Sequence, residues 1–244
     1  MAASLIFSRR SAVSLVDSDD TAFEVDLSIS TILNSKAVDS ESRGAVLASL
    51  NTALFSSRGE DRIGFAHQTF AACLAALKVH SLPLIQLRKL FCGVDGKVEH
   101  VVPQLAETAA WLAGTNDEVL EHLLTIDPGI LLRSNVARIQ GNRKEQIVRA
   151  ILERSKQLEL FDDFGLRRFL SGLKHERLAQ QLWEYIQDDA LNVIVRWLAL
   201  EIAEECRLIE LNDSLLAMPR RANLDQQVKE GAVRVLVKTL PDER

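Results

Sequence analysis

Histidines are the side chains of this sequence best suited to chemistry, as metal ligands or as proton carriers. His80, His100 and His122, together with Cys92, offer atoms that could bind a metal ion. They lack the i, i+4 or Cys-x-x-Cys spacing that places ligands side by side. The sequence therefore predicts no metal site.

Paired acids and possible nucleophiles do not form a recognisable active site either. The adjacent acids are Asp162-Asp163, Asp188-Asp189 and Glu204-Glu205. Neighbouring residues on a helix point in different directions, so we interpret these pairs as caps at helix starts, where they complement the helix dipole. No serine lies in a nucleophile elbow, and no cysteine has a histidine nearby in a recognisable arrangement. We expect no catalytic residue and no cofactor.

The composition favours an α-helical protein that does not bind nucleic acid. Leucine and alanine are abundant, whereas glycine, proline and tyrosine are sparse among the 244 residues. A net charge of -5 argues against a broad basic face, and we interpret pairs such as Arg9-Arg10 as solvated surface residues. No apolar run approaches the ~20 residues that span a bilayer.

The three cysteines, Cys73, Cys92 and Cys206, are odd in number and have no close pairing. We interpret them as small apolar residues in a reducing compartment. We therefore expect a cytoplasmic protein with neither a nucleic-acid nor a membrane partner.

Residues 62 to 76 are the stretch around which the other elements are organised. Ile63 and Phe65 predict a short extended lead-in to a helix that ends near residue 80. Residues Thr69, Phe70, Cys73, Leu74 and Leu77 recur at three- and four-residue spacing, the period of a buried helix face. Upstream, residues 43 to 54 predict an amphipathic helix, and residues 16 to 42 predict a connector dominated by loops, with one short helix. Residues 3 to 8 predict the end of a helix without a preceding cap, so we expect the natural polypeptide to extend upstream.

The rest of the chain predicts a succession of helices. They cover residues 84–91, 103–112, 118–124, 130–132, 144–157, 164–173, 178–186, 190–206, 211–217 and 226–240. Gly93 and Gly96 lack the spacing of a phosphate loop and predict a turn. The helices at 190–206 and 226–240 can be laid over each other, as inner helices of HEAT repeats can. We predict an all-α fold, with a helical segment over residues 1–96 followed by a short HEAT-like α-solenoid over residues 97–244.

Two groups of residues resemble a known family. Phe65-x-His67-Gln68-Thr69-Phe70 and Leu74-Ala75-Ala76 resemble the signature that lies downstream of the nucleotide-binding module in NACHT-type STAND NTPases. Ala72 and Cys73 stand where that family usually has glutamate and an aromatic residue. Residues 101 to 136 are similar to the region that follows in bacterial NACHT proteins. This second group includes Trp111, Asp127, Pro128 and Arg133, with Asn135 where aspartate often stands.

The resemblance covers roughly residues 1 to 160 and implies a piece of a prokaryotic STAND NTPase, a class of signalling switches that includes defence proteins. In these proteins a C-terminal repeat array recognises a trigger, and the upstream nucleotide-binding module then oligomerises. This chain matches neither the Walker A nor the Walker B motif. We therefore expect a non-catalytic module that contacts a protein partner or trigger, and the missing parts of its own chain.

Two further expectations concern the signature itself. A histidine in a nucleotide switch could report on a phosphate, but His67 stands between Phe65 and Phe70, so we interpret it as a hydrogen-bonded core residue. Phe65, Phe70 and Leu74 are expected to lock the helical segment onto the first repeat.

Two other classes of protein fit parts of the sequence. A self-contained HEAT-repeat scaffold is the alternative, and it predicts a natural start near Met1 and no apolar surface left by missing neighbours. A helical enzyme would need a pocket with convergent titratable groups.

Overall fold

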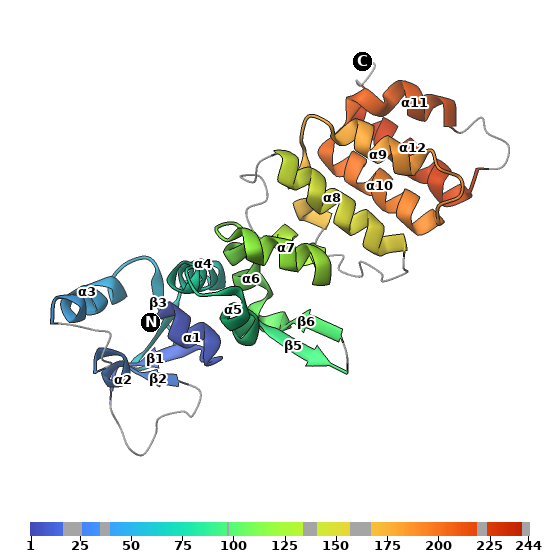
Figure 1. Ribbon diagram of the computed structural model, residues 1–244. Coiled ribbons are helices and arrows are strands. Elements are labelled where there is room, and N and C mark those ends of the chain that lie inside the picture. The colour runs from blue at the N-terminus through green and yellow to red at the C-terminus, as the bar shows by residue number, and fades with distance from the viewer. Residues whose placement is uncertain are drawn as a thin grey trace. The chain divides into compact units, whose positions relative to one another are not determined.

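A computed structural model describes residues 1–16, 26–34, 40–96, 98–133, 141–156, 167–218 and 224–240. Over these residues the fold is mainly α-helical with a few short strands, which confirms the helical character of the predicted fold (Figure 1). The chain divides into two compact units, Met1–Leu120 and Glu121–Arg244. Asn135, the pair Asp162-Asp163 and part of the connector predicted over residues 16 to 42 lie outside the described residues.

The first unit combines helices with a small mixed sheet. Its elements are α1 (Ala2–Phe7), β1 (Ala12–Ser14), β2 (Asp26–Ser28), α2 (Ile29–Leu33), α3 (Ser40–Leu50), β3 (Phe55–Ser57), β4 (Arg62–Phe65), α4 (Gln68–Val79), α5 (Leu84–Phe91), β5 (Cys92–Asp95), β6 (Val98–Val101), η1 (Pro103–Leu105) and α6 (Ala106–Ala113). The strand order is β2-β1-β4-β3, with β1 parallel to β2 and antiparallel to β4. The sequence predicted only the extended lead-in at β4, because strands of three or four residues are too short to show an alternating pattern.

Helix α4 packs through alanines, not through its large side chains. Its buried residues are Ala71, Ala72, Ala75, Ala76 and Val79, and α4 contacts both α1 and α6. Phe70, Leu74 and Leu77 are 41%, 39% and 49% exposed. The expectation that these three residues form the buried face is therefore wrong. Small side chains let neighbouring helices approach closely, and larger ones on the same face would hold them apart.

Phe65 is the aromatic residue of the signature that lies in the core. It is 6% exposed, and its ring centroid lies 4.5 Å from that of Phe55 on β3. The two residues are opposite each other in the antiparallel pairing of β3 with β4. Of the three residues expected to lock the helical segment in place, Phe65 alone is buried.

The second unit consists of helices and 3₁₀ turns. Its elements are η2 (Pro128–Arg133), α8 (Gly141–Lys156), η4 (Arg167–Leu173), α9 (Leu178–Ile186), α10 (Val193–Cys206), η5 (Ile209–Leu211), α11 (Asn212–Ala217) and α12 (Gln226–Thr239), and α7 (Asp117–Ile126) spans the division between the units. Helix α10 is central, because it contacts α8, α9, α12 and η4 (Figure 1). The bounds of α9, α10 and α12 follow the predicted helices closely, whereas the solenoid stays a prediction.

Helices α10 and α12 begin alike and pack closely. The side chains of Asn192 and Asp225 accept hydrogen bonds from the backbone N–H groups of Ile194 and Gln227, at 2.9 and 2.7 Å. These are N-caps, which satisfy backbone donors that a helix start leaves unpaired. Farther along α12, a Cβ atom at Gly231 would lie 2.9 Å from Cδ1 of Leu200. Glycine is disfavoured inside helices, so its presence here is explained by the close approach of α10.

Replacing Phe65 with alanine should destabilise the protein far more than the same change at Phe70. We expect Phe65→Ala to cost about 3 to 5 kcal/mol, because it empties a buried aromatic site. Phe70→Ala should cost less than about 1 kcal/mol, because that ring is largely solvated. Urea denaturation of the two variants and the parent chain measures both costs. If Phe70→Ala lowers the free energy of unfolding as much as Phe65→Ala, or more, then Phe70 lies on the buried face of α4, as the sequence predicted.

Candidate functional site

The signature residues lie at the junction of β4 and α4. His67 is the N-cap residue of α4, yet its side chain caps no backbone N–H. The imidazole is exposed and lies edge-on to Phe70, with ring centroids 5.6 Å apart. The interpretation of His67 as a core histidine is therefore wrong. Residues 67 to 70 present a histidine and a phenylalanine to solvent at the start of a helix.

The remaining signature residues belong to other elements. Trp111 is on α6, half-buried, and its Nε1 atom is buried without a hydrogen-bond partner among the described residues. In the second unit, Asp127 follows α7, and Pro128 is buried at the start of η2. Burial raises the pKa of the Asp127 carboxyl, against the opposing charges of Arg154 and Arg133. Arg133 is exposed at the end of η2.

A hairpin after α5 carries the most perturbed thiol of the first unit. Strands β5 and β6 are antiparallel, with Cys92 opposite Val101. The Glu99 carboxylate accepts two hydrogen bonds from Arg88 of α5, at 2.9 and 2.6 Å. Burial and the adjacent Glu99 raise the pKa of Cys92 to about 12, which keeps the thiol protonated at neutral pH.

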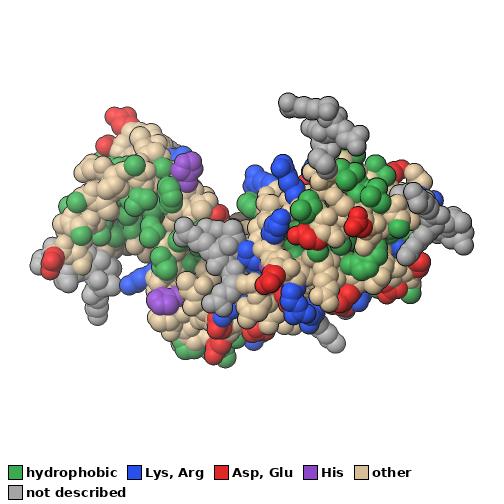
Figure 2. Space-filling view, turned by 90° about the horizontal axis from the view of Figure 1, so that it is seen from above, with side chains coloured by type: hydrophobic (Ala, Val, Ile, Leu, Met, Phe, Trp, Pro, Cys, Tyr) green, Lys and Arg blue, Asp and Glu red, His purple; other side chains and the backbone are tan. Residues whose placement is uncertain are grey.

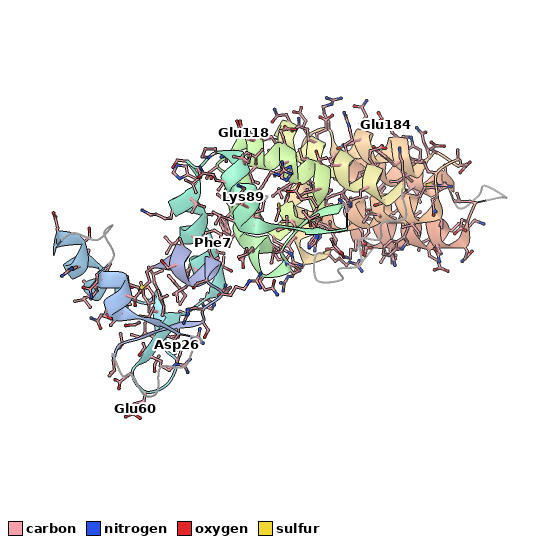
Figure 3. All side chains as sticks on the ribbon, turned by 60° about the horizontal axis from the view of Figure 1, so that its bottom comes forward. Phe7, Asp26, Glu60, Lys89, Glu118 and Glu184 are labelled. Carbon is pink, nitrogen blue, oxygen red and sulfur yellow. The ribbon has the colours of Figure 1, made fainter. Side chains whose placement is uncertain are left out.

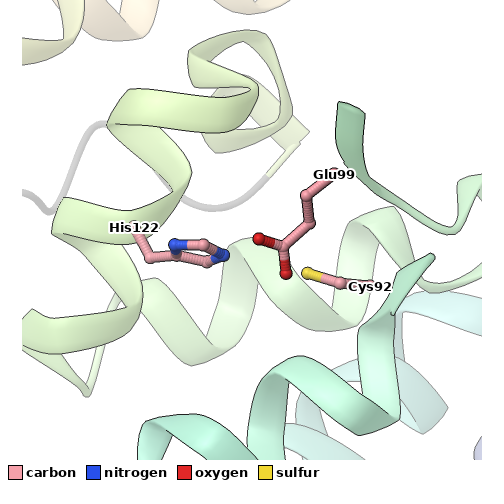
Figure 4. Close-up of side chains that lie close together, drawn as sticks. All are labelled: Cys92, Glu99 and His122. Atoms are coloured by element: carbon pink, nitrogen blue, oxygen red, sulfur yellow. The ribbon is translucent and has the colours of Figure 1, made fainter. Parts of the chain in front are cut away.

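Cys92 and Glu99 do not by themselves make a metal centre. Both side chains come from the hairpin (Figure 4). His122, which the same figure draws, belongs to α7 in the second unit. Two ligands are fewer than the three or four that a zinc site requires.

Three arginines line a pocket in the first unit. The pocket has a volume of about 350 Å³. Its lining residues are Leu5, Ile6, Arg10, Ser11, Arg58, Arg62, Phe65, Gln68 and Ala71. They come from α1 and the segment after it, the turn after β3, β4 and the first turn of α4.

Hydrogen bonds hold these arginines in place. The carboxylate of Asp26, at the start of β2 (Figure 3), accepts from Nε and Nη2 of Arg62 at 2.5 and 2.9 Å. Arg10 donates from Nη1 to the Asp26 carbonyl at 2.5 Å, and Arg58 donates from Nη2 to the Phe65 carbonyl at 2.6 Å. The side chain of Asp26 is only 2% exposed. Its negative charge is compensated by the bidentate ion pair with Arg62.

Sequence reasoning missed this pocket. Arg10 is half-buried and lines it, so the interpretation of Arg9-Arg10 as solvated surface residues is wrong for Arg10. Residues that are far apart in sequence meet here, and no motif joins them. Asp26 and Arg62 reach the same sheet through the pairing of β1 with β2 and with β4. A sequence prediction of these strand pairs would have been the signal.

The acidic pair Glu204-Glu205 lies at the end of α10, not at a helix start as predicted. Together with Glu201 it meets three cations from neighbouring elements, Arg167 of η4 and Arg234 and Lys238 of α12. Arg167 contacts all three carboxylates, at 3.3 Å for Glu201 and 3.0 Å for Glu204 and Glu205. Lys238 contacts Glu204 at 2.9 Å and Glu205 at 3.2 Å, and Arg234 lies 3.5 Å from Glu204. The cluster is an electrically balanced joint between α10, α12 and η4, which is a structural role.

Glu205 and Glu201 should affect stability with opposite dependence on pH. Burial alone would raise the pKa of Glu205, but hydrogen bonds from Lys238 and Arg167 outweigh it and hold this pKa below 4.5. Burial raises the pKa of Glu201 above 4.5, although Arg167 and Arg234 oppose this. A lowered carboxyl pKa stabilises the folded state at neutral pH, and this contribution disappears as the pH falls through the folded pKa. A raised pKa has the opposite sign.

The stability deficit of Glu205→Gln relative to the parent chain should therefore shrink as the pH falls from 7 to about 3. The matched variant Glu201→Gln should show a deficit that grows over the same range. Urea denaturation at several pH values measures both differences. If the stability deficits of the two variants change with pH in the same direction, the cluster does not shift the two carboxyl pKa values in opposite directions.

Comparison with models of protein families, with curated proteins and with solved structures finds no match to this chain. The resemblance to NACHT-type proteins therefore depends on the sequence signature. None of the described helices is long and apolar enough to cross a membrane.

Proposed function

We propose that this chain is a non-catalytic sensor and interaction module of a NACHT-type STAND NTPase in prokaryotic defence or signalling. In this proposal it acts in the cytoplasm, recognises a protein partner and restrains the switch. The ordered pair of sequence signatures motivates the family. One structural observation supports the interaction role, namely the solvent-exposed apolar side of α4.

The exposed apolar residues of α4 form a stripe along one side of the helix. Phe70, Leu74 and Leu77 occur at i, i+4 and i+7, so they lie on one side, and they are 41%, 39% and 49% exposed. Figure 2 shows hydrophobic side chains gathered on the visible face of the first unit. An apolar stripe of this spacing is the kind of surface by which a helix binds a groove in another protein.

Helix α3 adds apolar surface to the same unit. Leu47 of α3 is 48% exposed, and Leu54, which precedes β3, is 37% exposed.

In NACHT-type proteins the signature on β4 and α4 follows the nucleotide-binding module. We therefore assign the stripe on α4 to contact with that module, which the switch must hold in its inactive state.

The exposed stripe favours this proposal over the two other classes. A self-contained HEAT-repeat scaffold predicts no apolar surface left by missing neighbours. A helical enzyme needs a general acid or base in its pocket, and the nine residues that line the arginine pocket include no histidine, cysteine or acid.

The reading frame around this chain is the first test. We expect it to encode a nucleotide-binding module with Walker A and Walker B motifs upstream of residue 1. A natural protein without that module would contradict the family assignment and leave the HEAT-repeat scaffold as the better explanation.

The second test measures binding between the upstream module and this chain, expressed as separate polypeptides. Phe70→Asp and Leu77→Asp should each weaken the association at least tenfold in calorimetry, which is about 1.4 kcal/mol. Ile85→Asp on α5 is the matched control, because Ile85 is 66% exposed and lies outside the stripe. Equal effects of all three changes would refute a contact through α4.

A further inference from the structure

The apolar stripe of α4 lies in a part of the chain without acidic residues. The sequence contains 34 aspartates and glutamates, yet none stands between Asp61 and Asp95. Helices α4 and α5 both belong to this segment. Complementary charge across an interface attracts the right partner, and like charge repels others. The charged groups beside the stripe therefore indicate the kind of partner that it fits.

Lys78 is the cation on one border of the stripe. It follows Leu74 by four residues and lies in the last turn of α4, so the two side chains are neighbours on the helix surface. Lys78 is exposed, and no carboxylate of the described residues forms an ion pair with it. Its ammonium group is thus open to a carboxylate that a partner places beside the apolar contact.

His67 provides a polar group at the other end of the stripe. Its exposed imidazole lies edge-on to Phe70, with ring centroids 5.6 Å apart. An imidazole donates a hydrogen bond from its N–H group, and it becomes cationic when protonated. A donor therefore adjoins the stripe at each end of α4.

The opposite border of the stripe lies near an acid. With 3.6 residues per turn, Cys73 lies on the side of Phe70 that faces away from Lys78. Burial, and after it the charge of Glu107 on α6, raises the pKa of the Cys73 thiol, so the Glu107 carboxylate is close to this border. The two borders thus differ in charge, and this difference distinguishes one side of a bound partner from the other.

We propose that the segment that covers this stripe is an amphipathic helix with carboxylates along one border of its apolar side. The inference rests on the proposed use of α4 as a binding surface and names the chemistry of its partner. Apolar side chains of the partner pack on Phe70, Leu74 and Leu77, and its carboxylates accept hydrogen bonds from Lys78 and His67. A helix has the matching shape, because side chains at i, i+4 and i+7 interlock with those of a second helix.

A lipid surface is the other occupant that an apolar helix side beside a lysine could take. Interfacial helices insert a broad apolar side into the membrane and expose the rest of their surface to water. The rest of α4 consists largely of alanines that are buried against α1 and α6. Only a narrow stripe of three large side chains is left for binding. This width fits one helix of a protein partner better than a membrane.

Fluorescence anisotropy with two synthetic helical peptides tests the proposal on the whole chain. The peptides share one stripe of leucines and differ along one border of it, which carries glutamates in one peptide and glutamines in the other. We expect the glutamate peptide to bind roughly fivefold more tightly, since exposed ion pairs make modest contributions. The difference should shrink as the salt concentration rises, because salt screens such pairs.

Variants on α4 and α5 decide whether the border charge selects the partner. Lys78→Glu puts an acid on each border of the stripe, so it should weaken binding of the glutamate peptide by roughly fivefold or more. Lys89→Glu is the matched control, because it makes the same change of charge at an exposed lysine of α5, outside the stripe (Figure 3). Phe70→Asp should weaken binding of both peptides. Thermal melting of each variant verifies that the fold is retained.

Four outcomes would overturn the inference. The first is that neither peptide binds, and the second is that both bind equally to the parent chain. The third is an equal effect of Lys78→Glu and Lys89→Glu, which would assign the preference to the overall charge of the unit. The fourth is binding to vesicles of phosphatidylcholine and phosphatidylserine that Phe70→Asp abolishes, which would assign the stripe to a lipid surface.

Failure of this inference is distinguishable from failure of the proposed function. If both peptides bind equally and Phe70→Asp abolishes their binding, the stripe is a binding surface and only the acidic partner is wrong. If the reading frame encodes no nucleotide-binding module, the family assignment is wrong, and a preference for the glutamate peptide still identifies the chemistry of the partner.

Discussion

The close packing of the alanine face of α4 is the constraint on which the first unit depends. Contact with α1 and α6 on this face requires side chains no larger than alanine at several successive turns. Because α1 lies against α4, the segment that follows α1 brings Arg10 to the first turn of α4. The same packing turns Phe70, Leu74 and Leu77 outward. One set of small residues thus positions both the arginine pocket and the apolar stripe.

The second unit is held together by different means. Its central helix α10 buries apolar residues against α8, α9 and α12, and it also carries three carboxylates near its C-terminal end. Ion pairs in a partly buried place contribute more to the specificity of packing than to its net free energy, because desolvation offsets their attraction. The balanced cluster of Glu201, Glu204 and Glu205 with cations of η4 and α12 joins these three elements. Apolar burial supplies most of the stability.

Much of the helical content could be predicted from the sequence, since apolar spacing marks the helices and turn residues such as Gly93 follow their ends. Helices α5 and α9 have the predicted bounds. The buried side of α4 could not be predicted in this way, because alanines and large apolar residues both recur at helical spacing on neighbouring sides. The choice between them depends on how closely α1 and α6 approach, which is a tertiary property. The pocket was missed for a related reason: Arg62 and Asp26 meet only once the strands have paired.

Gly231 limits how the second unit can change during evolution. Leu200 fills the space that any side chain at residue 231 would need, and both residues lie where α10 and α12 pack. A larger residue at position 231 of α12 requires the side chain of residue 200 to shift or to become smaller, so that the summed volume stays constant. The two positions, which are on different helices, are therefore a coupled pair. Related sequences should show compensating changes there, and covariation of this pair would reveal the α10–α12 contact without a structure.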